Sequence, residues 1–99
     1  MEPNLLLTRL GPRIKLFRRH IREWTDLLIH QRQLRQLTRA ELNNKLSSLS
    51  DSQRIIERTR QANRLAQLDI RQAQERQRLQ FRQQQEERNL EEVLKPGQA

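Results

Sequence analysis

Large apolar residues recur at helical spacing in the first half of the chain. The intervals are three, four, three and four residues along the series Ile14, Phe17, Ile21, Trp24 and Leu28. Such intervals place side chains on one face of an α-helix, and we expect this face to make contacts in a core or in a dimer. The pattern predicts a long helical arm, which we place over 13–46.

Gly11 and Pro12 interrupt this pattern near its start. Glycine suits the position just after a helix, and proline suits the first turn of the next helix. We therefore predict a separate apolar turn or short helix over 1–12, before the arm begins.

Short polar residues interrupt the pattern again over 47–51. Ser50 and Gln53 have the spacing of a capping box, and Asp51 suits the positive end of a helix dipole. The sequence therefore predicts a Ser-rich turn followed by a new helix. An earlier capping-box spacing begins at Thr38 and marks a possible break within the first arm.

A second long helix is predicted over 52–94, with a tail at 95–99. Its apolar stripe contains small and β-branched residues at helical spacing: Ile55, Thr59, Ala62, Ala66, Ile70 and Ala73. A lone hairpin with so few apolar residues has little core, so we expect an all-α hairpin that forms a dimer. The expected core or dimer contacts are Phe17, Ile21, Trp24, Leu28, Ile55 and Ile70.

Composition supports a helical fold and excludes several classes of protein. Arginine, leucine and glutamine supply 17, 17 and 14 of the 99 residues, and only 33% of residues are apolar. A β-sandwich needs more β-branched and aromatic residues. Without cysteine there is no disulfide, thiolate zinc site or cysteine nucleophile. Apolar runs of three residues are too short to cross a membrane.

Positive charge is concentrated in the first half of the chain. Residues 1–50 contain ten Lys or Arg and four Asp or Glu, whereas residues 51–99 contain ten and eight. Arginine donates hydrogen bonds in a planar fork that matches phosphate oxygens. We therefore expect binding of RNA or another polyanion through phosphate contacts. The candidate residues are Arg13, Lys15, Arg18, Arg19 and Arg22, followed by Arg32, Arg35 and Arg39.

Other functions remain open at this point. The long second helix could be a coiled-coil surface for a protein partner. The apolar face of the first arm, with its basic flanks, also fits a helix that lies on a membrane surface. His20 and His30 are ten residues apart and do not have metal-ligand spacing. No catalytic residue, cofactor or metal site is expected, so we predict a protein that is not an enzyme.

A short segment resembles a known family. Its matching residues are Ile21, Arg22, Glu23, Trp24, Arg32, Leu34, Leu37, Thr38, Glu41 and Leu42. They resemble the YjiS-like family of small, arginine-rich bacterial proteins. Where that family has Asp-Ile-Gly-Leu, this chain has Asn-Lys-Leu-Ser over 44–47. The resemblance implies a cytoplasmic regulator linked to RNA binding. In shape alone, the expected dimer is also similar to nodavirus-type silencing suppressors, which lie along double-stranded RNA.

Overall fold

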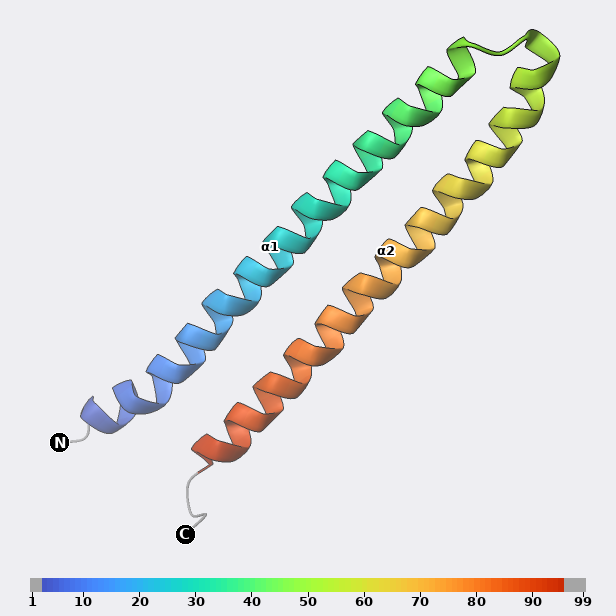
Figure 1. The fold of residues 1–99 in the computed structure, drawn as a ribbon. Coiled ribbons are helices and arrows are strands. Elements are labelled where there is room, and N and C mark those ends of the chain that lie inside the picture. The colour runs from blue at the N-terminus through green and yellow to red at the C-terminus, as the bar shows by residue number, and fades with distance from the viewer. Residues whose placement is uncertain (1–2, 96–99) are drawn as a thin grey trace. The chain divides into compact units, whose positions relative to one another are not determined.

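The chain is an all-α helical hairpin in the computed structural model, which describes residues 3–95 and the side chains of residues 10–95 (Figure 1). Helix α1 comprises Pro3–Ser47 and helix α2 comprises Asp51–Leu94. No helix among the described residues is long and apolar enough to cross a membrane. The side chains of the predicted apolar turn up to residue 9, and the end of the tail at 96–99, lie outside the described residues.

The turn between the helices lies where the polar cluster predicted it. The backbone N–H of Ser50 donates to the Gln53 side-chain oxygen at 3.2 Å, which is one half of a capping box. The last carbonyls of α1 also find donors, because Arg54 Nε donates to the Leu46 carbonyl at 3.1 Å. Each helix end at the turn thus gains a side-chain partner, and the predicted boundaries of the turn differ from the observed ones by about one residue.

Neither predicted interruption of the first arm is present, because α1 continues through Gly11, Pro12 and Thr38. The break at Gly11 and Pro12 was wrong: proline has a helical φ, so it removes one backbone hydrogen bond without ending the helix. The Thr38 hydroxyl donates to the Leu34 carbonyl at 2.8 Å. A threonine that bonds to the carbonyl four residues earlier lies within a helix and does not cap one.

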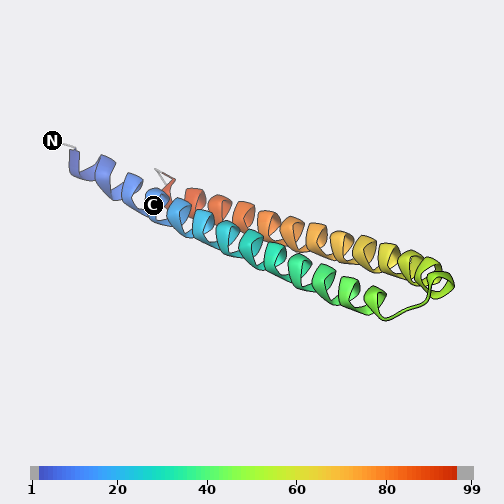
Figure 2. The same cartoon turned by 90° about the horizontal axis from the view of Figure 1, so that it is seen from above.

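The chain forms two compact units. The terminal unit contains residues 1–26 and 77–99, and the turn unit contains residues 27–76. In each unit a segment of α1 packs antiparallel against a segment of α2, and Figure 2 shows this pairing from above. Hydrogen bonds and ion pairs that join the two helices occur in both units, so each can be described by itself.

Glutamine side chains join the two helices at regular intervals. The Gln61 amide donates to the Leu42 carbonyl at 2.8 Å, and the Gln72 amide donates to the Gln31 carbonyl at 2.9 Å. In the terminal unit, the Gln83 amide makes the same bond to a backbone carbonyl of α1. We call Gln61, Gln72 and Gln83 the glutamine ladder. Their 11-residue spacing corresponds to 3.67 residues per turn, which keeps one helix face directed at its neighbour.

The fully buried positions between the helices are mostly polar. Leu42 is the one buried hydrophobic residue among the described side chains. The polar or charged residues buried there are His20, Gln31, Glu57, Gln61 and Gln72. Buried amides of this kind need partners, and the ladder provides them. The hairpin therefore combines matched hydrogen bonds with half-buried leucines such as Leu27, Leu65 and Leu68.

The predicted apolar face of the first arm does not form the core of this hairpin. Five of the six nominated core or dimer residues are exposed by 39 to 70%, and they are Phe17, Ile21, Leu28, Ile55 and Ile70. Trp24 alone is half-buried. As core contacts these five were wrong, because polar residues with a different spacing occupy the interface. Their role as dimer contacts remains a prediction.

Substitution of Gln72 tests how much the glutamine ladder contributes to the free energy of unfolding. We expect Gln72→Ala to lower the free energy of unfolding by about 1–2 kcal/mol, since it removes a hydrogen bond and leaves a void. Gln72→Leu fills the space and leaves no buried polar group without a partner. The free energy of unfolding should therefore stay nearly the same or rise. Urea denaturation followed by circular dichroism measures both. Equal losses for the two variants would contradict this view of the ladder.

Candidate nucleic-acid interface

All eight cations nominated from the sequence lie on α1, and they fall into two groups. Three of them are held by carboxylates of α2, and five are exposed without a partner among the described side chains. The distinction matters because a guanidinium already bonded to a carboxylate has fewer donors to offer a phosphate.

Arg13 belongs to the paired group. Its Nε and Nη2 atoms donate to the two carboxylate oxygens of Glu91 at 2.7 and 2.8 Å, a bidentate contact. The hydrogen bond raises the pKa of Arg13 and holds the pKa of Glu91 below its ordinary value. Arg13 therefore joins the two helices of the terminal unit, and its predicted role in phosphate binding is not supported by this geometry.

Arg19 and Arg35 are also paired. Arg19 forms an ion pair with Glu86 in the terminal unit, and Arg35 forms one with Asp69 in the turn unit. Both arginines remain partly exposed, so solvent screens these contacts. We assign Arg13, Arg19 and Arg35 to pairing of the helices.

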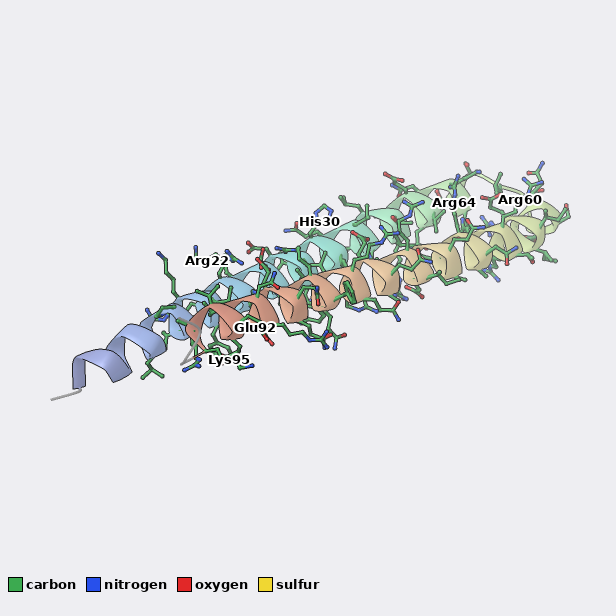
Figure 3. The ribbon with its side chains drawn as sticks, turned by 90° about the horizontal axis from the view of Figure 1, so that it is seen from below. Arg22, His30, Arg60, Arg64, Glu92 and Lys95 are labelled. Atoms are coloured by element: carbon green, nitrogen blue, oxygen red, sulfur yellow. The ribbon has the colours of Figure 1, made fainter. Side chains whose placement is uncertain are left out.

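Lys15, Arg18 and Arg22 form a free cationic row in the terminal unit. All three are exposed, and no hydrogen bond or ion pair joins them to another side chain in the described range 10–95. Intervals of three and four residues place them on one side of α1. Figure 3 shows Arg22 projecting from α1 away from α2.

A groove of about 830 Å³ lies beside this row. The three free cations line it together with Arg19, while Leu16, Leu90 and Val93 supply apolar surface. Glu86, whose charge Arg19 offsets, is the one acidic residue in its lining. Lys15 and Arg22 are seven residues apart, or about 10 Å along the helix, which matches roughly three phosphate spacings along one strand. The groove can therefore hold a short run of phosphates.

In the turn unit, Arg32 and Arg39 are likewise exposed and have no partner among the described side chains. They lie seven residues apart, or two helical turns, on one side of α1. The structure thus supports five of the eight nominated cations as available donors.

Helix α2 carries further free arginines that we did not nominate. They are exposed and unpaired within the described part of the chain, and they are Arg58, Arg64, Arg71 and Arg78. The heptad spacing of the last three was visible in the sequence. The nearly balanced charge of the second half does not reveal that these arginines are free. They are free because the acidic residues of that half pair with other cations.

His20 lies in a cluster that sequence spacing alone does not reveal. The ring is buried, with Nε2 3.2 Å from a Glu86 oxygen and Nδ1 3.4 Å from a Glu87 oxygen. Ligand atoms of His20, Glu23 and Glu86 lie within 4.8 Å of one another, a grouping that a metal ion could use. However, guanidinium groups of Arg19 and Arg82 already bind these carboxylates. We therefore interpret the cluster as an ion-pair network.

Glu23 depends on Arg82 within this network. Burial by itself would raise the pKa of the Glu23 carboxyl. The hydrogen bond and charge of Arg82, with smaller effects from Gln83 and Arg19, outweigh burial and hold this pKa below its ordinary value. The Arg82 contact is 2.7 Å, whereas the other Glu23 oxygen is buried without a hydrogen bond. Loss of Arg82 would leave a partly buried carboxylate uncompensated.

We expect Arg82→Gln to lower the free energy of unfolding by about 1 kcal/mol at neutral pH, a modest value because Arg82 is half exposed. A carboxylate with a lowered pKa stabilises the fold above its unfolded pKa, and this stabilisation disappears as pH falls through the folded value. The difference from the wild type should therefore shrink toward pH ~3. Thermal unfolding at both pH values measures it.

Arg88→Gln is the matched control, because the one hydrogen bond of Arg88 to a described side chain is a long one, to Gln85 at 3.5 Å. It should have little effect at either pH. A destabilisation by Arg82→Gln that stays constant with pH would contradict the assignment.

Comparison of the chain with family models, curated proteins and solved structures gives no match.

Proposed function

We propose that this chain is a small non-catalytic protein that binds RNA or another nucleic acid through its phosphates, in a regulatory role. The observation that carries the proposal is the free cationic row of Lys15, Arg18 and Arg22. These residues line one groove and have no carboxylate partner among the described side chains. In the same unit, Glu23, Glu86 and Glu91 are already engaged by other arginines.

Contacts of this type favour recognition of backbone and shape. Lysine and arginine on a regular helix can bind phosphates one turn apart, and such contacts position a protein without reading base sequence. Double-stranded RNA is recognised mainly in this way, since its deep major groove excludes side chains. The regulatory role implied by the resemblance to YjiS-like proteins is of the same kind.

The experiment is a titration of labelled duplex and single-stranded RNA by fluorescence anisotropy. We expect binding that weakens as salt rises. Three phosphate contacts would lower affinity about 20- to 40-fold between roughly 50 and 200 mM salt, by the slopes known for single- and double-stranded DNA. Absence of salt-dependent binding to either RNA would refute the proposal.

Assembly with another protein is the second candidate function. It is favoured by the exposure of apolar residues on α2, where Ile55, Ile70 and Phe81 are exposed by 60 to 70%. Helices with such outward apolar positions commonly pack against further helices. Lys15 and Arg22 would have no part in this function, so substitution of both distinguishes the two candidates.

A further inference from the structure

In the terminal unit, α1 carries an exposed apolar series that lies outside the layer between the helices. We call Leu10, Ile14, Phe17 and Ile21 the outer seam. Their exposed fractions are 49, 42, 64 and 49%. The intervals of four, three and four residues are those of a coiled-coil seam, in which each large side chain inserts between residues of a facing helix. The seam therefore fits a helical partner.

Few apolar side chains of the hairpin are fully buried within the described range 10–95. Only Leu42 is a buried hydrophobic residue among the described side chains. In contrast, thirteen large hydrophobic residues among the described side chains are exposed by 36 to 78%, and the four seam residues are among them. A standard protein interface buries about 800 Å² per partner, so a stable dimer would bury the seam together with neighbouring residues of the terminal unit.

Opposite charges flank the outer seam on its two sides. On one side lies Arg18, which is exposed and has no partner among the described side chains. On the other side, a groove of about 440 Å³ is lined by Ile14 and Phe17 of α1 and by Leu90, Glu87 and Glu91 of α2. Arg13 also lines this groove and binds Glu91, whereas Glu87 contacts only the His20 ring among the described side chains, at 3.4 Å. The seam is therefore bordered by Arg18 on one side and by Glu87 on the other.

This charge arrangement is self-complementary. In a two-fold dimer with parallel seams, each side of the seam meets the opposite side of its copy. Arg18 of one copy would then face Glu87 of the other. Antiparallel seams would place Arg18 opposite Arg18, which is unfavourable.

We propose that the outer seam is the interface between two copies of this chain, with the two seams parallel. Phe17 is the central anchor, and the groove beside it receives side chains of the second copy. Each copy covers the exposed apolar side chains of the other copy's seam. Lys15 and Arg22 do not belong to the seam. Arg18 borders the seam and is also part of the free cationic row, so in the dimer Lys15 and Arg22 remain the cations available to phosphates.

Cysteine cross-linking tests the proposal in a chain that contains no cysteine of its own. In parallel seams each residue meets its own counterpart, so Ile14→Cys and Ile21→Cys should each give disulfide-linked dimers on oxidation. Asp26→Cys is the control, because Asp26 is exposed and lies on another side of the helix. Cross-linking at both seam positions and not at 26 supports the proposal. Cross-linking at only one seam position, or at neither, overturns it.

Sedimentation equilibrium at micromolar concentration provides the second measurement. The wild type should be a dimer, and Phe17→Glu should weaken association about 100-fold or more. A monomeric wild type overturns the proposal. Arg18→Glu should also weaken the dimer, and Glu87→Arg in the same chain should restore it; absence of restoration contradicts the parallel arrangement. A monomer that co-sediments with vesicles containing anionic lipid would show that a membrane, and not a second copy, covers the seam.

Discussion

Replacement of Lys15 and Arg22 by glutamate is expected to weaken binding of duplex RNA by about 100-fold or more at moderate salt. Each residue is exposed and free of carboxylate partners among the described side chains, so each can make a charge-assisted contact. Two such contacts at about 1.5 kcal/mol each amount to a factor of roughly 100. Repulsion between glutamate and phosphate adds to this loss. Fluorescence anisotropy with a labelled duplex measures the affinity directly.

The control separates a local site from bulk charge. Arg64→Glu combined with Arg71→Glu changes the net charge by the same amount, on exposed and unpaired residues of α2. We expect this variant to bind much more tightly than the α1 variant, with a loss of about tenfold or less from the altered net charge. If the two variants lost affinity equally, the groove beside Lys15 and Arg22 would not be the site.

Leu42→Ala is expected to cause the largest loss of stability among single substitutions in this chain. Leu42 is 4% exposed and lies against Gln61, which donates to its carbonyl. Truncation of a buried leucine costs about 2–5 kcal/mol, because it removes apolar contacts and leaves a cavity. For a small hairpin such a loss is comparable with the total free energy of unfolding. Thermal and urea unfolding followed by circular dichroism measure it.

Leu37→Ala provides the comparison on the same helix. Leu37 is 63% exposed, so its truncation should change the free energy of unfolding by about 0.5 kcal/mol or less. Equal destabilisation by both variants would mean that Leu37 is buried in solution and that the assignment of Leu42 as the core residue is wrong.

The sequence predicted the helices and the turn but not the face that joins them. Helix formers and the polar cluster at 47–51 are local signals, so two helices and the Ser50 cap followed from them. Phe17 and Ile21 were predicted to be core or dimer contacts because they are apolar and have helical spacing. The observed interface instead uses Gln61 and Gln72, whose polarity is typical of exposed helix positions. Only their hydrogen bonds to the opposite backbone explain why they are buried.

The candidate site could be predicted only in part, since charge alone does not tell which cations are free. Arg13 and Lys15 look equivalent in the sequence, yet Arg13 binds Glu91, whereas Lys15 forms no ion pair with a described residue. The register of the antiparallel helices decides this, and the register depends on contacts between distant residues. The same register places His20 beside Glu86, and no local motif in the sequence indicates this contact.

The salt dependence of RNA binding tests the central claim most directly. Affinity would be measured at several salt concentrations for the wild type and for Lys15→Gln combined with Arg22→Gln. If both residues bind phosphates, the plot of log affinity against log salt should be less steep for the variant, by about 1.4 to 1.8 units for two lost contacts. Equal slopes for the two proteins would contradict the claim that these cations bind the phosphate backbone.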